Sequence, residues 1–300
     1  MKSEPHPVVV PEGLSLRDEL NLRARLWARA HGYTAAEIGG EASSLLFGCD
    51  EAGRHGNFHP EVYAAILRNT GWMKRLGKVH TAYKRSRARA DWPWRELDAG
   101  TSSDALLMNV FCHPQTRRNI ALHTLLGESA GLGTEPVFGV KPRTPLASGR
   151  SDTTEMDMRL GDLLVEAKLT EADFQTAPET LIQRYQEIEE VFDSAYLPRL
   201  ADGRVSGYQL IRGTLAAHAT GLGFAVLCDA RRPNLVEIWF QVQRCVRPLE
   251  LRMRLKLLTW QEVAATLGDE HRSFLAARYG IFPSSGSSGI SGVSQPGTGQ

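Results

Sequence analysis

The 300-residue sequence has few cysteines and no long apolar run. Its four cysteines, Cys49, Cys112, Cys228 and Cys245, are widely spaced, and none belongs to a Cys-x-x-Cys pair. Neither a disulfide framework nor a zinc ribbon is therefore expected. No stretch of about 18 apolar residues occurs, which argues against a transmembrane helix. Because residues 1–5 also lack the apolar core of a signal peptide, we expect a cytoplasmic protein with no membrane association.

An excess of one charge is missing as well. The 35 Lys and Arg residues balance 34 Asp and Glu residues, which leaves a net charge of +1. A protein that works through gross charge is excluded, although a local basic face is not. Apolar residues at 42% and charged residues at 23% are typical of a globular chain that buries a core. No repeat with a period of about 20 to 50 residues is evident, so solenoids and propellers are excluded.

Several common active-site motifs are absent. The phosphate-binding motif G-x-x-x-x-G-K-S/T does not occur, and residues 221–224 lack the third glycine of a dinucleotide site. Residues 102–104 lack the glycines of a serine nucleophile elbow. His55 and His59, with Cys49 nearby, do not have zinc-ligand spacing. The sequence therefore predicts neither an ATPase, nor a dehydrogenase, nor a serine hydrolase.

Composition and periodicity divide the chain into three parts. Residues 1–100 show helical periodicity broken by Gly and Pro and no convincing strand, which predicts a mainly helical N-terminal extension. Residues 101–283 alternate between helical and strand patterns, which predicts an α/β domain. Residues 284–300 are rich in Ser and Gly and predict a disordered tail.

The predicted elements of the α/β domain follow from local patterns. A capping box at Thr176 and Glu179 predicts the start of a helix, and a second one at Thr259 and Glu262 predicts another. The expected strands are residues 136–140, 155–160, 163–169, 224–228 and 255–258. The expected helices are residues 120–131, 176–192, 208–218, 235–246 and one that begins near residue 259.

Chemistry-bearing residues concentrate in residues 155–169. In an extended strand, Asp157 shares one face with Glu155, and Glu166 shares one face with Lys168. The Gly161-Asp162 pair predicts a tight turn that folds the two strands antiparallel. We therefore expect Asp157, Glu166 and Lys168 to come within reach of one another.

Two carboxylates beside an ammonium group fit metal-dependent phosphodiester hydrolysis. Hard oxygen ligands suit Mg²⁺ or Mn²⁺, which lowers the pKa of a bound water and stabilises charge on the phosphate. Lys168 would position the nucleophile. As an exposed lysine it would contribute little to stability, so Lys168→Ala should abolish cleavage and leave folding intact. The alternative interpretation is the solvated face of an ordinary hairpin.

The acid followed nine residues later by Glu166-Ala167-Lys168 resembles the PD-(D/E)XK nuclease superfamily. The chain also resembles a group of uncharacterised bacterial proteins predicted to be nucleases of that superfamily. The resemblance implies a restriction-endonuclease-like mixed central sheet flanked by helices. It also implies a magnesium-dependent endonuclease, a hydrolase that cleaves nucleic acid, with DNA the expected substrate. Asp157, Glu166 and the carbonyl oxygen of Ala167 would then bind the metal, and Lys168 would orient or help deprotonate the water.

The resemblance extends to residues outside the hairpin. The helix before the sheet often contributes a carboxylate in this superfamily, and Glu128 is the matching residue. The helix after the Glu-x-Lys strand often carries Gln or Tyr, and Gln183 and Tyr185 are the matching residues. No proline precedes Asp157, and Asp152 competes with it as the first acid. The alternatives are a surface acid at Glu128 and a buried aromatic beside an exposed amide at residues 183–185.

Two basic concentrations predict a nucleic-acid partner. The first covers residues 74–89 and contains no acid, with Tyr83, Trp92 and Trp94 in or after it. The second covers residues 231–256. Both fit contacts to phosphates, with aromatic stacking on bases, and both also fit solvated surfaces. Rival interpretations are an inactive nucleic-acid-binding protein of the same fold and a protein-interaction module. A homodimer is favoured weakly, by analogy with enzymes that cut both strands.

Overall fold

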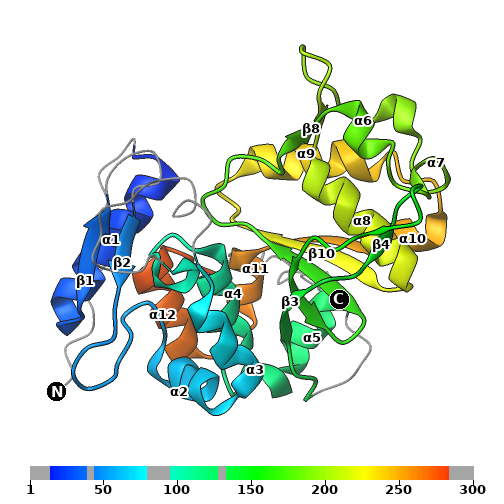
Figure 1. The fold of residues 1–300 in the computed structure, drawn as a ribbon. Helices are drawn as coiled ribbons and strands as arrows, with labels where there is room; N and C mark the ends of the chain where they lie inside the picture. The colour runs from blue at the N-terminus through cyan, green and yellow to red at the C-terminus, as the bar shows by residue number, and fades with distance from the viewer. Residues whose placement is uncertain (1–13, 39–43, 80–94, 128–132, 284–300) are drawn as a thin grey trace, which may run out of the picture.

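A five-stranded mixed sheet with helices on both faces forms the centre of the protein (Figure 1). The computed structural model describes residues 14–38, 44–79, 95–127 and 133–283. The strand order is β11-β10-β7-β6-β3. The predicted fold class, a mixed central sheet flanked by helices with a mainly helical N-terminal portion, is confirmed. Within the described ranges, no helix is both long and apolar enough to cross a membrane.

The sheet combines an antiparallel half and a parallel half. β3 (Val137–Val140), β6 (Met156–Leu160) and β7 (Leu163–Ala167) pair antiparallel. β10 (Gly223–Cys228) and β11 (Leu255–Thr259) continue the sheet parallel to β7. Every residue of β10 is buried because helices cover both of its faces, as its unbroken apolar run predicts. Gly161, at φ 56°, supplies the left-handed conformation of the tight turn between β6 and β7.

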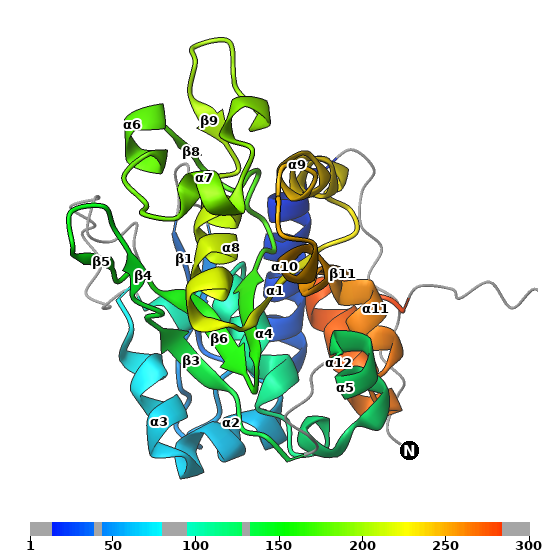
Figure 2. The ribbon, with the colours of Figure 1, turned by 90° about the vertical axis from the view of Figure 1, so that its right-hand side faces the viewer.

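Two helical layers enclose the sheet, as Figure 2 shows from the side. One face packs against α4 (Ser103–Phe111), α5 (Ile120–Leu126), α11 (Trp260–Ala265) and α12 (Asp269–Tyr279). The other face packs against α8 (Tyr208–Thr220) and α9 (Pro233–Gln243). Apolar side chains of β7 alternate between the two cores, so that Val165 joins the first and Leu164 joins the second.

The N-terminal portion is mainly helical and packs onto the sheet domain. It contains α1 (Leu16–His31), α2 (Pro60–Arg68), α3 (Thr70–Met73), η1 (Lys74–Gly77) and η2 (Glu96–Asp98). It also contains a short hairpin that the sequence did not predict, β1 (Ala35–Ile38) with β2 (Ser44–Phe47). Arg278 of α12 is fully buried against the ring of Phe47 and donates hydrogen bonds to Asn57 Oδ1 and the carbonyl of Gly100.

The predicted continuous helix over residues 176–192 is wrong. This segment forms β8 (Thr176–Ala177), α6 (Glu179–Ile182) and α7 (Ile188–Val191). The capping box is not formed at Thr176, whose hydroxyl instead accepts a hydrogen bond from Arg204 Nε at 2.9 Å. The capping box at Thr259 and Glu262 is confirmed. Further short elements are η3 (Thr116–Arg118), β4 (Thr144–Pro145), β5 (Ser151–Asp152), η4 (Ser194–Tyr196), β9 (Val205–Ser206) and α10 (Leu249–Met253).

Three buried histidines cluster where α2, α4 and α12 meet. The rings of His113 and His271 stack with centroids 4.4 Å apart, and the ring of His59 lies 5.3 Å from that of His113. Burial lowers the pKa of all three imidazoles, and their mutual repulsion adds to the effect for His113 and His271. The pKa of His271 falls to about 3. Glu61 and Glu270 oppose the shift from the rim of the cluster.

Acidification should destabilise the protein through this cluster. The folded chain binds protons more weakly than the unfolded chain, so stability is present above the ordinary histidine pKa and is lost as the pH falls from there towards 3. Each histidine whose pKa is fully depressed lowers the free energy of unfolding by about 1.4 kcal/mol for each pH unit of acidification in this range. Thermal unfolding measured between about pH 8 and pH 5 should show a shallower pH dependence for His271→Gln than for the wild type. The matched variant His31→Gln, at an exposed site, should keep the wild-type slope; equal slopes for all three proteins would contradict this assignment.

Candidate active site at the β6–β7 hairpin

Asp157 and Glu166 face each other at the edge of the sheet where β6 begins and β7 ends. The register pairs Met158 with Val165, so one further step places Asp157 across from Glu166. Asp157 Oδ2 accepts a hydrogen bond from the backbone N–H of Ala167 at 2.8 Å, which ties the carboxylate to β7. The hairpin thus brings together the two acids that the alternating pattern placed on one face.

Glu166 and Lys168 form a buried ion pair. Only 3% of Glu166 and 5% of Lys168 are exposed. Glu166 Oε1 accepts hydrogen bonds from Lys168 Nζ at 2.8 Å and from Gln209 Nε2 at 2.7 Å. The sequence-based expectation of an exposed lysine is therefore wrong, because Lys168 leaves β7 between β10 and α11. Its backbone N–H donates to the carbonyl of Leu227, and its carbonyl accepts from Trp260 Nε1, both at 2.8 Å.

The pKa values of Asp157 and Lys168 are both raised, for different reasons. Burial raises the pKa of Asp157 well above its usual value, and the charges of Glu166 and Asp104 raise it further. Burial alone would lower the pKa of Lys168, but Glu166, Glu171 and Asp157 outweigh burial and raise it above its usual value. At neutral pH Lys168 is therefore an ammonium group, and the surrounding carboxylates form a negative site that favours a cation.

The oxygens that remain open at this site fit a hard divalent cation. Among the described residues, no hydrogen bond reaches Asp157 Oδ1 or Glu166 Oε2. In the part of the chain that the structure describes, no three His, Cys, Asp or Glu side chains are arranged to hold a metal ion. The donor set is therefore two carboxylates. Mg²⁺ commonly binds through one or two carboxylates and keeps several waters, so the residues present fit it.

Asp104 is a third acid near the site that sequence reasoning missed. It lies in the first turn of α4, which begins after the N-cap Ser102. Asp104 Oδ2 accepts hydrogen bonds from Arg75 Nη2 at 3.0 Å and Lys78 Nζ at 2.9 Å. The helix that places a carboxylate near Asp157 is thus α4. The one sequence signal that could have indicated the start of this helix was a serine N-cap followed by an acid. Glu128, expected in this role, lies outside the described residues.

Asp152 belongs to a separate polar cluster. Its Oδ1 accepts from the backbone N–H and hydroxyl of Thr154, at 2.8 and 2.5 Å. Its Oδ2 accepts from Arg184 Nη2 at 3.0 Å and from the hydroxyl of Tyr185. Both oxygens of Asp152 are therefore engaged away from Glu166, whereas Asp157 lies directly opposite it.

The structure does not bring Gln183 and Tyr185 to the Glu166 carboxylate. Gln183 is exposed and donates to Glu189 Oε1 at 3.3 Å, and buried Tyr185 contacts Asp152. The amide that reaches Glu166 belongs to Gln209, in the first turn of α8. No local signal distinguished Gln209 from Gln183, because both were expected within helices that follow β7.

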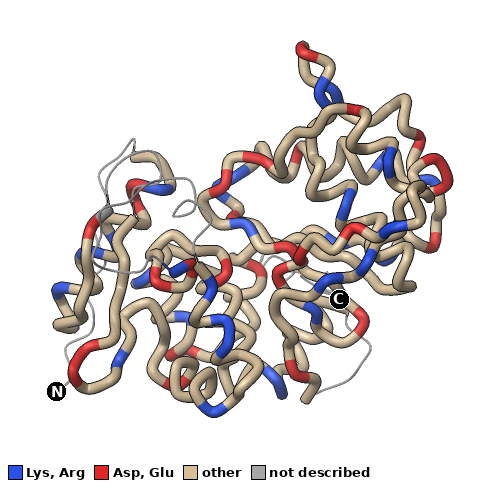
Figure 3. The backbone as a smooth tube through the Cα atoms, viewed as in Figure 1, with Lys and Arg blue, Asp and Glu red and all other residues tan. Residues whose placement is uncertain are grey.

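The described residues of the two basic concentrations are largely engaged in internal contacts, and Lys84, Arg85, Arg87 and Arg89 of the first lie outside the described residues. In the first, Arg75 and Lys78 bind acids, while Tyr83, Trp92 and Trp94 lie outside the described residues. In the second, Arg231 binds Asp229 and Glu19. Basic and acidic segments are intermixed along the described chain (Figure 3).

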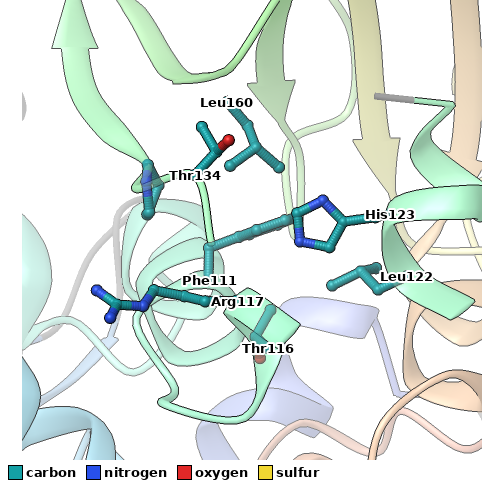
Figure 4. A pocket seen from close by; sticks show the side chains of 8 residues that line it. Phe111, Thr116, Arg117, Leu122, His123, Thr134 and Leu160 are labelled. Atoms are coloured by element: carbon teal, nitrogen blue, oxygen red, sulfur yellow. The ribbon is translucent and has the colours of Figure 1, made fainter. Parts of the chain in front are cut away.

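Two hollows in the described structure lie away from the acid pair. The one in Figure 4 lies between Phe111 of α4, Leu122 of α5 and Leu160 at the far end of β6. The other lies between Trp72, Cys112 and Glu135. Neither includes Asp157, Glu166 or Lys168, so these hollows do not mark the candidate site.

Comparison with known proteins finds one family. The family model described as Restriction Endonuclease associating with ARP matches residues 21–280. This match covers most of the N-terminal portion and the whole described five-stranded sheet. No curated protein and no solved structure matches the chain.

Breaking the buried ion pair should lower stability. Lys168→Met leaves Glu166 buried without its cation, which typically costs about 3 to 5 kcal/mol. The double variant Lys168→Met/Glu166→Gln should recover much of this loss, because no buried charge remains. Urea unfolding in EDTA measures all three free energies of unfolding. Arg25→Met, which breaks the exposed pair with Glu37, should cost about 1 kcal/mol or less; a similarly small cost for Lys168→Met would show that the buried pair is not formed.

Proposed function

The chain belongs to the family described as Restriction Endonuclease associating with ARP, and on that premise we propose that it is a metal-dependent nuclease. In this proposal it hydrolyses phosphodiester bonds of nucleic acid, with DNA as the substrate. The observation that carries the proposal is the hydrogen bond from the backbone N–H of Ala167, the residue after Glu166, to Asp157, together with Lys168 buried against Glu166. This placement agrees with the resemblance of the hairpin to PD-(D/E)XK nucleases.

Asp157, Glu166 and the carbonyl oxygen of Ala167 are the proposed ligands of Mg²⁺ or Mn²⁺. Such an ion lowers the pKa of a bound water and stabilises negative charge on the scissile phosphate. Gln209 and Lys168 both bind Glu166 Oε1, and so they leave Oε2 to the cation. Glu128 remains a proposed additional ligand outside the described residues.

Lys168 is proposed to orient the attacking water and to stabilise developing charge. Because neighbouring acids raise its pKa, the ammonium form dominates at neutral pH and has no free lone pair for deprotonating water. Of the two roles expected for this lysine, the structure therefore favours orientation and electrostatic stabilisation. The proton of the water would leave to solvent or to the phosphate.

A second candidate function is nucleic-acid binding without catalysis. The observation that favours it is the low exposure of Glu166 and Lys168, 3% and 5%, which restricts access of a phosphate. In either case nucleic acid is the proposed partner. The exposed Lys141, Arg143 and Arg150, around β4 and β5, are available for phosphate contacts.

Cleavage assays separate the two functions. The wild type should cut plasmid or linear DNA with Mg²⁺ or Mn²⁺ and not with EDTA, and Asp157→Asn should lose about 100-fold or more of the rate. Asp152→Asn is the matched control, because Asp152 is bound by Thr154, Arg184 and Tyr185. It should retain cleavage if it stays folded. Salt-sensitive DNA binding without any cleavage by the wild type would favour the second function.

Metal binding should also be visible without catalysis. A cation that binds only the folded chain raises its stability, by about 2.7 kcal/mol at a concentration about 100 times Kd. Thermal unfolding with Mn²⁺ and with EDTA should therefore differ for the wild type and much less for Asp157→Asn. An equal shift in both proteins would place the cation elsewhere.

A further inference from the structure

Arg75 and Lys78 form a closed network with two acids beside Asp157. Arg75 donates to Glu155 Oε1 at 2.6 Å and to Asp104 Oδ2 at 3.0 Å. Lys78 Nζ lies 2.9 Å from Asp104 Oδ2 and 3.2 Å from Glu155 Oε1. Only 9% of the Arg75 side chain and 8% of the Asp104 side chain are exposed. Each cation thus binds both carboxylates, with Arg75 and Asp104 buried and the side chains of Lys78 and Glu155 31% and 33% exposed. The contacts are charge-assisted hydrogen bonds, which are stronger than neutral ones.

The backbone is shaped to admit Arg75. The segment after α3 passes over β3 at Gly139, where an added Cβ would come within 2.6 Å of Arg75 Nη1 and 3.2 Å of Glu155 Oε2. Gly139 also has φ 70°, a conformation that other residues rarely adopt. The guanidinium therefore reaches the start of β6 because residue 139 has no side chain.

Asp157 lies between two groups of acids. Glu166 lies across from it by extension of the β6–β7 register, and Glu155 lies two residues before it, directly ahead of the start of β6. The charge of Asp157 interacts with those of Asp104 and Arg75, and Arg75 binds Asp104 and Glu155 directly, so the two acid groups are in electrostatic contact. An acid in this position resembles the shared carboxylate of a two-metal site, where two ions lie about 3.5 to 4 Å apart.

We propose that Arg75 and Lys78 occupy the position that a second divalent cation would take, so that the Asp157–Glu166 pair binds a single divalent ion. The inference rests on the proposed metal-dependent function. The third and fourth acids are held by protein cations, and only two carboxylates are left for the metal.

Removing both cations should open a second metal position. In Arg75→Met/Lys78→Met, Asp104 and Glu155 keep neighbours of similar length but lose their counter-charges. Partly buried acids without counter-charges bind a divalent cation readily, because the cation relieves their repulsion. The double variant should then bind two ions where the wild type binds one.

The experiment counts bound Mn²⁺ by titration calorimetry and by the electron paramagnetic resonance signal of free Mn²⁺, with circular dichroism to verify folding. We expect one ion per wild-type chain and two per Arg75→Met/Lys78→Met chain. Arg117→Met is the matched control, because it removes an arginine from an exposed pair with Glu135, and it should bind one.

The outcomes distinguish this inference from the proposed function. No bound Mn²⁺ in the wild type would overturn the proposed metal site and this inference with it. Two ions in the wild type, or one in the folded double variant, would overturn the inference alone. Asp104→Asn tests the same point without the double variant, since it keeps Arg75 bound to Glu155. It should bind no more than one ion, because no second position is opened, and two bound ions would overturn the inference.

Discussion

The proximity of Asp157 and Glu166 is the constraint on which the surrounding structure depends. Two carboxylates at a largely buried sheet edge repel each other, and leaving buried charge unpaired costs several kcal/mol. Lys168 compensates from the same strand as Glu166, and Gln209 adds a neutral donor from α8. Hydrogen bonds to Trp260 and Leu227 then hold the backbone of Lys168 in place. Elements on both sides of β7 therefore stabilise this one ion pair. The arrangement is stable only while each of these partners stays in place.

Much of the sheet could be predicted because its signals are local. Alternation in β6, the unbroken apolar run of β10 and the Gly161-Asp162 turn each follow from neighbouring residues. The same local logic placed Asp157 opposite Glu166, since a two-residue turn fixes the register of a hairpin and a slip of one residue would reverse every face. The candidate acid pair was therefore predictable to the extent that the hairpin was.

The remaining parts of the site depend on contacts that are distant in sequence. Lys168 was expected to be exposed because an alternating strand pattern does not reveal that α11 and β10 bury the C-terminal end of β7. Residues 176–192 have helical spacing, yet Tyr185 lies between α6 and α7, where its ring packs into the core and its hydroxyl donates to Asp152. Asp104 and Gln209 reach the site only because α4 and α8 begin at the same edge of the sheet. No spacing rule connects residues that are more than 40 positions apart.

The N-terminal portion contributes directly to the charge balance of the site. Without Arg75 and Lys78, the acids Asp104 and Glu155 would add two negative charges to those of Asp157 and Glu166. The contact requires a fixed position of η1, and α3 secures it, since Trp72 donates to the carbonyl of Pro136 at 2.8 Å. The boundary that composition indicates near residue 100 therefore separates regions of different sequence character, while the electrostatics of the hairpin depend on both regions. The candidate site therefore depends on Arg75 and Lys78 as well as on the hairpin, and both segments lie within the family-matched region, residues 21–280.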